Sequence, residues 1–261
     1  MISRILKEPL PQLRLVSLFR LILSAVLVLS LAGCATSGSR SPDYDRFEGV
    51  NRSIHRFNMA GDRVLFRPLA QIYDDALPDP AKTGIRNVFN NLWEPATVVN
   101  DLLQGKPAMA GRDMMRFVIN TTFGILGLFD VAHIFGLPRR EEDFGQTLAV
   151  WGVPSGPYVV LPFLGPSTLR DTFGTVVRSV YTDALAYAES PDREYATVLR
   201  IISGRARLLP ADDILAAQPD QYLFIREAWT QQRNLLIHDG QGVSDDPENS
   251  EEGLIKDLLE E

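Results

Sequence analysis

The only cysteine of the chain, Cys34, follows directly on an apolar run and the small residues Ala32 and Gly33. A basic segment, an apolar segment and a small-residue pair before a cysteine are typical of a bacterial lipoprotein signal. We therefore expect cleavage between Gly33 and Cys34 and attachment of a diacylglycerol to the Cys34 sulfur. A lone cysteine also excludes an intrachain disulfide, so the folded part must be stabilised by packing.

The alternative for the first apolar segment is a permanent transmembrane helix. Residues 21–31 form an apolar run that is shorter than the roughly 20 residues needed to cross a bilayer, which disfavours that alternative. Two or more acyl chains on Cys34 would hold the mature protein firmly in its leaflet. Ala35 follows the cysteine in place of an aspartate, as in lipoproteins that are sorted onward to the outer membrane of Gram-negative cells.

The charge distribution divides the chain into parts. We expect a signal peptide over residues 1–33, a flexible Ser/Gly linker over 34–42, one helical domain over 43–243 and an acidic, disordered tail over 244–261. The tail alone carries a net charge of −7, and the domain carries only −3. No part is basic enough to indicate binding to nucleic acid.

Apolar residues recur at helical spacing through most of the domain. The predicted helices are one that begins after Asp43 or Asp45 and continues to Leu65, and others over about 81–92, 95–103, 107–117, 167–180, 190–202 and 220–237. Pro95 is expected in the first turn of its helix, and Ser167 is expected to cap another. Residues 158–162 form the only strand-like run, and its bounding prolines predict an extended segment outside any large sheet. The fold class is therefore all-α, with little or no sheet.

Residues 117–137 form an apolar stretch that contains one acid, Asp130, and no lysine or arginine. Its length would span a bilayer, but an aspartate near the middle would cost a few kcal/mol there. Gly124 and Gly127 favour two shorter helices in a glycine-broken hairpin that is buried or dips into the acyl region. An ordinary core hairpin remains the alternative for this stretch.

The sequence offers no set of residues for catalysis or metal binding. The three histidines, His55, His133 and His238, have none of the spacings of a metal site. Ser155 lies in Gly-Val-Pro-Ser-Gly, which has the wrong offset and a proline for a nucleophile turn. We therefore predict neither enzymatic activity nor a cofactor. Amphipathic helices joined in a ring could lie in a membrane with their polar faces around a central opening.

Ordered short motifs run through the domain and carry a resemblance to a known family. They include Phe47-Glu48-Gly49-Val50-Asn51-Arg52, Asn91-Leu92-Trp93-Glu94-Pro95-Ala96, Leu103-Gln104-Gly105, Asp130-Val131-Ala132, Phe144-Gly145-Gln146-Thr147-Leu148, Gly156-Pro157-Tyr158 and Arg226-Glu227-Ala228. With these motifs behind a lipoprotein signal, the chain resembles the VacJ/MlaA family over about residues 43–237.

The resemblance implies a ring-like helical lipoprotein in the inner, periplasmic-side leaflet of the outer membrane. Such a protein removes mislocalised phospholipids from the outer leaflet through an amphipathic channel and passes them to a soluble periplasmic carrier (MlaC). The carrier delivers to an inner-membrane ABC transporter complex, and this retrograde transport (the Mla pathway) maintains lipid asymmetry. The resemblance also implies association with a trimeric outer-membrane porin.

The resemblance also suggests which residues serve lipid passage. Phe57 and Asn58 would lie beside the channel, and Ile125, Gly127, Asp130 and Gly136 would belong to the hairpin near its opening. Helix packing for Phe57 and a cap or turn for Asn58 remain equally open from the sequence. A scaffolding lipoprotein that only holds porins is the alternative function, and a phospholipid hydrolase is a third hypothesis.

Overall fold

The computed structural model describes residues 45–181 and 184–240. The predicted signal peptide with Gly33, the predicted lipidation site Cys34, the predicted linker and the acidic tail lie outside the described residues. The rest of this section concerns the unit that begins at Asp45. None of its described helices is both long enough and apolar enough to cross a bilayer.

The first predicted helix continues well past its expected end at Leu65. The helical chain consists of α2 (Glu48–Gly61), a π-helical turn (Asp62–Phe66) and α3 (Arg67–Ala76). Pro68 lies in the first turn of α3, directly after the π turn, so its missing N–H interrupts the helical hydrogen-bond pattern at this junction. A π turn holds more residues per turn than an α-helix. It therefore rotates the side chains of α3 about the helix axis relative to those of α2.

Helix α4 (Asp79–Leu103) corrects a prediction, because it passes through Pro95 without ending. The sequence predicted two helices, with Pro95 opening the second. A proline inside a helix removes one hydrogen bond and crowds the carbonyl four residues earlier. The long contact between α4 and α5 (Pro107–Thr122) outweighs that cost, because it buries Glu94 and Ala96 on either side of the proline.

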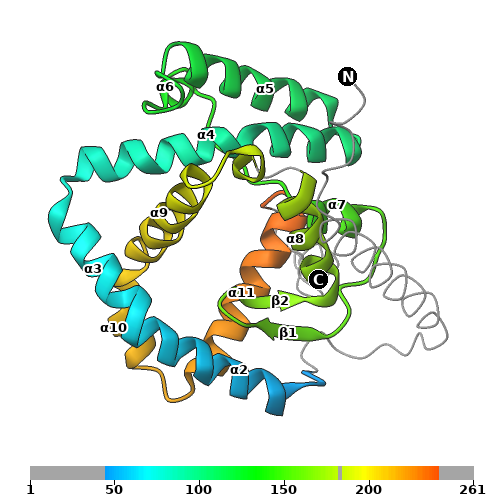
Figure 1. Ribbon diagram of the computed structural model, residues 1–261. Coiled ribbons are helices and arrows are strands. Elements are labelled where there is room, and N and C mark those ends of the chain that lie inside the picture. The colour runs from blue at the N-terminus through cyan, green and yellow to red at the C-terminus, as the bar shows by residue number, and fades with distance from the viewer. Residues whose placement is uncertain (1–44, 182–183, 241–261) are drawn as a thin grey trace, which may run out of the picture. The chain divides into compact units, whose positions relative to one another are not determined.

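The glycine-broken hairpin is present where the sequence predicted it. Helix α5 ends at Thr122, a run of turns follows, and α6 (Val131–Ile134) packs back against α5. The second helix of the hairpin is only one turn long. In Figure 1, α4 and α5 lie side by side, and α6 stands at one end of α5.

The strand-like run forms β1 (Tyr158–Leu161), which pairs antiparallel with β2 (Gly165–Thr168). This hairpin agrees with the prediction of an extended segment outside any large sheet. Helix α7 (Phe144–Val150) precedes the hairpin, and α8 (Leu169–Tyr181) follows it. The cap of α8 is Thr168 and not Ser167, because the Asp171 N–H donates to the Thr168 hydroxyl at 3.2 Å.

The remaining described elements are short helices around two longer ones. They are the 3₁₀ turns Ala184–Tyr187 and Leu209–Ala211, α9 (Asp192–Ala206), α10 (Asp212–Ala216) and α11 (Gln221–Ile237). Asp220 caps α11 by accepting from the N–H groups of Tyr222 and Leu223, both at 3.1 Å. Helix α9 packs on α3 and α4, and α11 packs on α7 and β2.

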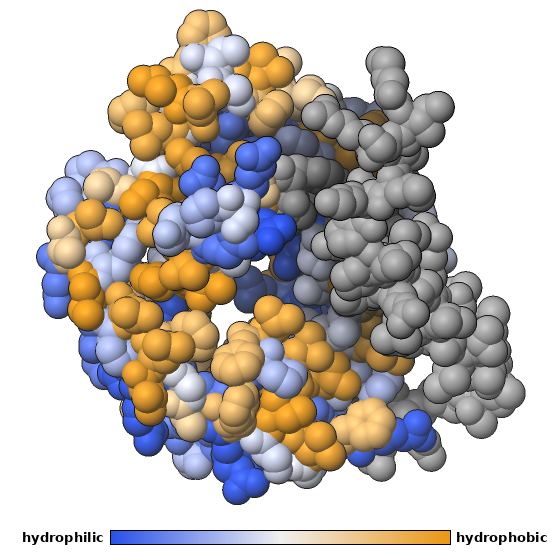
Figure 2. Space-filling model, viewed as in Figure 1, coloured by the Kyte–Doolittle hydropathy of each residue, from blue (hydrophilic) through white to orange (hydrophobic). Residues whose placement is uncertain are grey.

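The helices of this unit follow one another around a central region. In Figure 1, α2, α3 and α4 run along its edge, and α9 and α11 lie on their inner side. In the space-filling view of Figure 2, the background is visible between the described side chains near the middle. The arrangement confirms the predicted fold: helices in a ring-like order, with one two-stranded sheet in the described ranges.

Candidate functional site

The interior of this unit is polar. Its largest fully buried side chains are Arg116, Gln146, Glu94, Asn51, Thr97, Thr147, Asp101 and Asp113. The buried apolar residues are mostly alanines, namely Ala70, Ala96, Ala110, Ala132 and Ala206, with Val98, Val160 and Tyr222. Soluble domains bury large apolar side chains and leave charged ones in water. Here that distribution is inverted.

Large apolar side chains are correspondingly exposed, and Figure 2 shows many of them gathered over α5 and α6. We call residues 123–136 the apolar tip. Its exposed large residues are Phe123, Ile125, Leu126, Leu128, Phe129, Ile134 and Phe135. A contiguous apolar surface of this kind marks contact with a protein or a membrane. Acyl chains would remove the cost of holding these side chains in water.

The backbone of the apolar tip turns sharply, and that turn depends on glycine. Gly127 has φ +91°, and a Cβ atom there would lie 2.4 Å from the Cβ of Asn91 in α4. Ile125 and Leu126 also have positive φ values, of 52° and 55°, which cost about 1–3 kcal/mol each in non-glycine residues. Hydrogen bonds hold the turn, because the Leu126 and Gly127 N–H groups donate to the carbonyls of Thr121 and Asn120.

A buried ion network fastens the apolar tip to α4 and α5. Arg116 in α5 donates to the Glu94 carboxylate at 3.0 Å and to Asp130 at 3.2 Å, and it also bonds the Leu137 carbonyl. Asn120 donates to Asp130 at 3.0 Å and accepts from the Ala132 N–H at 2.8 Å. Every residue of this network is buried or half-buried, so its bonds fix the tip relative to α4.

Asp130 is therefore tied into the scaffold. Burial raises the pKa of its carboxyl, but the hydrogen bond from Asn120 and the charge of Arg116 outweigh that effect and lower the pKa overall. Asp130 also caps α6 by accepting from the His133 N–H at 3.2 Å. These contacts explain an aspartate inside an apolar stretch.

The structure brings four of the predicted site residues together on the apolar tip: Ile125, Gly127, Asp130 and Gly136. Phe57 and Asn58 lie elsewhere, on α2 beside the turn between β1 and β2. The Asn58 amide donates to the Leu161 carbonyl at 2.9 Å and accepts from the Phe163 N–H at 2.8 Å. The Phe57 ring meets the Phe163 ring edge-on at 5.1 Å. A role of these six residues in lipid passage stays a prediction.

Two cavities open into the polar interior. The larger, of about 610 Å³, lies among α3, α4 and α9, and its lining includes Lys82, Arg86, Trp93 and Arg200. The smaller, of about 210 Å³, lies among α7, α8 and α11. Arg178 of α8 lines both cavities. Charged and polar side chains thus line much of the space enclosed by the helices.

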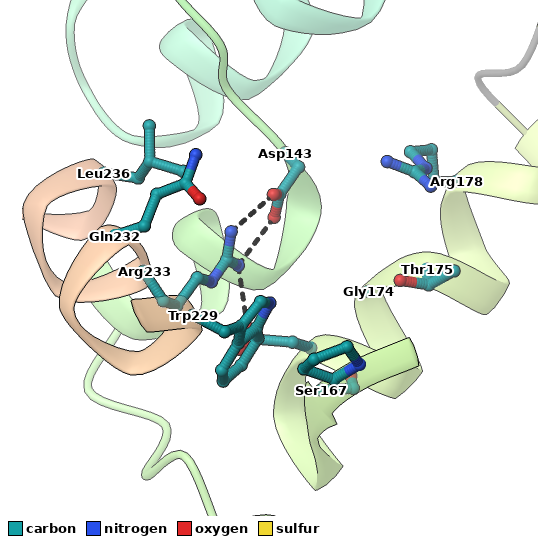
Figure 3. A pocket seen from close by; sticks show the side chains of 11 residues that line it. Asp143, Ser167, Gly174, Thr175, Arg178, Trp229, Gln232, Arg233 and Leu236 are labelled. Atoms are coloured by element: carbon teal, nitrogen blue, oxygen red, sulfur yellow. Dashed lines mark hydrogen bonds and ion pairs between the residues drawn. The ribbon is translucent and has the colours of Figure 1, made fainter. Parts of the chain in front are cut away.

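Arg233 of α11 organises the smaller cavity, as Figure 3 shows. Its guanidinium binds the Asp143 carboxylate through two nitrogens, at 2.6 and 2.9 Å, and Asp171 at 2.7 Å. Burial raises the pKa of Asp143, but the bonds and charge of Arg233 dominate and lower it to about 2. These ions hold α7, α8 and α11 together, and α8 approaches α7 so closely that a Cβ on Gly174 would lie 2.6 Å from the Gly145 nitrogen.

The described ranges contain no group of three or more acidic, histidine or cysteine side chains that could hold a metal ion. The charged residues of the larger cavity were not singled out from the sequence. Trp93, Arg178 and Arg200 lie on different helices and are far apart along the chain, so no spacing rule brings them together. The only local indication of this charged cavity in the sequence is the number of arginines on α9.

Comparisons with known proteins agree with this architecture. The family model for the MlaA lipoprotein matches residues 43–236. The chain is 38% identical over 216 residues to the "Intermembrane phospholipid transport system lipoprotein MlaA" of Escherichia coli K12, which covers 81% of this chain and 86% of the relative. The protein of the same name from Haemophilus influenzae is 32% identical over 248 residues, or 92% of this chain and 97% of the relative.

A solved structure reported as "Structural basis for maintenance of bacterial outer membrane lipid asymmetry" is also similar. It superposes with a TM-score of 0.67 at 38% sequence identity, and the match covers 74% of this chain and 99% of the solved one. The family match, the relatives and the solved structure all span most of the domain. The chain belongs to the MlaA lipoprotein family.

Proposed function

We propose that this protein removes phospholipids mislocalised to the outer leaflet of a Gram-negative outer membrane and passes them inward, which maintains lipid asymmetry. The observation that carries the proposal is the inverted distribution of side chains, with charged residues such as Arg116 inside and apolar residues such as Phe123 exposed. The names of the relatives and of the similar solved structure support the same function.

The chemistry of a phospholipid explains why this distribution suits transport. Moving a charged headgroup through hydrocarbon is costly unless polar partners replace its water. A polar interior supplies such partners, while the acyl chains remain beside apolar surface. The protein needs no chemical step for this passage, so we propose that it has no catalytic activity of its own.

The remaining parts of the proposal concern the anchor and the partners. Cys34 would carry the acyl chains that hold the protein at the periplasmic side of the outer membrane. A trimeric porin would bind beside it, and a periplasmic carrier of the MlaC type would accept the lipid. The energy would come from an inner-membrane ABC transporter complex that the carrier reaches.

The direct test uses a Gram-negative strain that lacks its own MlaA protein. Expression of this chain should lower the phospholipid exposed at the cell surface and restore resistance to detergent plus chelator. The Cys34→Ala variant should remain unprocessed or mislocalised and should restore neither property. Unchanged surface phospholipid with the correctly located wild-type chain would rule out the transport function.

The second candidate is a scaffold for porins or other envelope partners. Exposed apolar side chains on α2 and the π turn, including Val50, Val64 and Leu65, favour a protein contact there. If the protein is only a scaffold, Phe57→Ala and Asn58→Ala should leave surface phospholipid unchanged, and Val64→Asn should disturb the assembly. In the transport function, the Phe57 and Asn58 variants alter surface phospholipid.

A hydrolase activity is tested on purified protein. Mixed micelles of phospholipid and detergent are incubated with the lipidated chain, and released fatty acid is measured against a known phospholipase. We expect no release above the rate of a sample without protein. Release that scales with the amount of this chain would contradict a purely passive role.

A further inference from the structure

Helix α9 has one polar face, and the contacts of the helix show where that face points. Arg200, Ser203, Gly204 and Arg207 of α9 line the larger cavity. That cavity also has walls from α3 and α4, and α9 packs on both of these helices. The polar face of α9 is therefore turned toward α3 and α4.

Another face of α9 is apolar and exposed. Every exposed residue in the segment 195–201 is apolar, namely Tyr195, Val198, Leu199 and Ile201, which are 70%, 53%, 36% and 47% exposed. Spacings of three and four residues place these side chains together on one side of a helix. We call them the apolar face of α9. With 3.6 residues per turn, this face is turned away from α3 and α4.

The place of α9 in the fold separates its apolar face from the apolar side chains of the outer helices. In Figure 1, α2, α3 and α4 run along the edge, and α9 lies on their inner side. Lipid of the surrounding leaflet would meet outer side chains such as Val64 and Ile72, which are 79% and 64% exposed. A molecule that covers the apolar face of α9 has to enter the central region.

Helix α11 lies across the central region from α9 (Figure 1), and its exposed residues carry no charge. They are Phe224, Ala228, Gln231, Gln232, Asn234 and Leu235. The charged residues Arg226, Glu227 and Arg233 of this helix are half-buried or buried. Covering an ion with hydrocarbon is costly, and a surface without charges avoids that cost. Both inner helices thus expose surface that hydrocarbon can cover.

We propose that the apolar face of α9 binds the fatty acyl chains of a phospholipid in transit. The proposal rests on the proposed function, and it adds the residues that hold the hydrocarbon part of the lipid. Acyl chains bind apolar surface without needing any polar partner. The 15 residues of α9 extend about 22 Å, which exceeds the roughly 15 Å of hydrocarbon in one leaflet. One helix is therefore long enough to accompany an acyl chain.

The test captures lipid in cells that lack their own MlaA protein. The full chain carries photoreactive benzoylphenylalanine in place of Val198 on α9 or, as the control, in place of Ile72 on α3. A chelator raises the phospholipid in the outer leaflet, and phospholipid captured on the protein is measured after illumination. Occupancy of a site rises with its ligand, so capture at Val198 should increase about threefold or more. Capture at Ile72 should stay constant, because the leaflet around it is unchanged.

Substitutions then test whether the face serves transport. Val198→Asn with Ile201→Asn should slow the loss of surface phospholipid after chelator removal about tenfold, because apolar contacts with the acyl chains are lost. Val198→Leu with Ile201→Leu keeps those contacts and should retain the wild-type rate. The matched control is Val118→Asn with Ile72→Asn, which changes the same residue types at exposed positions on α5 and α3. That control should alter the rate less than about twofold, because lipid in transit does not touch it.

Four results would overturn the proposal: no lipid captured at Val198, capture there that the chelator leaves unchanged, capture of a protein in place of lipid, or a wild-type rate in the asparagine variant. Unchanged capture would assign the face to lipid of the surrounding leaflet, and captured protein would make it a docking site. If the asparagine variant does not fold, the capture experiment decides alone. A wild-type chain that lowers surface phospholipid without a response at Val198 keeps the proposed function and refutes this site.

Discussion

The guanidinium of Arg116 in α5 donates to the carboxylate of Glu94 in α4 at 3.0 Å, and only 1% of either side chain is exposed. Burial raises the pKa of Glu94, whereas the hydrogen bond and charge of Arg116 act to lower it. A charge buried this deeply is tolerated only when an opposite charge is paired with it. This pair joins the two helices that carry the apolar tip, and Arg116 extends the link to Asp130.

The first prediction concerns Arg116→Met, which leaves Glu94 buried without its partner. We expect the free energy of unfolding to fall by about 3–5 kcal/mol. Adding Glu94→Gln should recover part of that loss, because the uncompensated charge is removed. Chemical unfolding in detergent micelles, with both single variants and the double variant, measures the coupling energy. Additive effects of the two changes would contradict the buried pairing.

The second prediction concerns Asp101, which is fully buried beside Asp113 and 3.6 Å from Arg140. Burial raises the pKa of Asp101 to about 7. The charge of Arg140 lowers this pKa, and the charge of Asp113 raises it. Between pH 4 and 7 the unfolded chain therefore loses a proton that the folded chain keeps. Stability falls as the pH rises through this window, by at most about 1.4 kcal/mol per pH unit.

Asp101→Asn tests this pH dependence. The asparagine keeps the shape of the side chain but cannot lose a proton, so the variant should lose less stability than the wild type between pH 5 and 8. The measurement is the Tm of both proteins across that range in the same detergent. Parallel curves would show that Asp101 does not titrate in this window.

The third prediction compares two glycines of the apolar tip. Gly136 has φ +77° with open space around its missing side chain, whereas Gly127 has φ +91° and lies against Asn91. Gly136→Ala should cost about 1–2 kcal/mol for the left-handed backbone alone. Gly127→Ala should cost a further 1–3 kcal/mol, because its Cβ would collide with α4. Equal unfolding free energies of the two variants would show that the tip is not packed on α4 as described.

The fourth prediction concerns Phe123 and Phe135, which are 74% and 68% exposed. Serine at both positions should change the free energy of unfolding in detergent by less than about 0.5 kcal/mol, because neither ring is packed. With Cys34→Ala, which removes the predicted lipid attachment site, the same change should weaken binding to phospholipid vesicles strongly. Each phenylalanine contributes about 1.5–3 kcal/mol when it enters an apolar phase.

Leucine at these two positions is the matched control, because it keeps most of the apolar area. Vesicle flotation should recover the leucine variant with the membranes, as it does the wild type, and leave the serine variant in solution. Equal flotation of the serine variant would mean that the apolar tip does not enter the membrane.

The sequence predicted the helical fold well, because most helices carry clear periodicity and a glycine or proline follows many of them within a few residues. The glycine-broken hairpin followed from Gly124 and Gly127, and Asp130 argued against a plain membrane-spanning helix. Local rules misjudged Pro95, because the buried contacts of Glu94 and Ala96 with α5 outweigh the cost of an interior proline. They also placed the cap at Ser167, one residue before Thr168, within their usual margin.

The polar interior was harder to foresee. A charged residue in an amphipathic helix is ordinarily placed in water, and nothing in the local sequence separates Arg116 from an exposed arginine. Its burial follows from long-range partners, Glu94 in α4 and Asp130 at the tip. The arginines around Trp93 likewise meet only because α4, α8 and α9 surround one space.

The central claim is that polar side chains of this protein face a headgroup path while its apolar surface lies among acyl chains. Fluorescent probes at Leu126→Cys, on the apolar tip, and at Ser203→Cys, in the larger cavity, test it. The predicted acyl chains on Cys34 would keep that thiol from being labelled. In vesicles, brominated acyl chains should quench the Leu126 probe only, and headgroup spin labels should quench the Ser203 probe. The account would be contradicted if brominated acyl chains did not quench the Leu126 probe, or if headgroup spin labels did not quench the Ser203 probe.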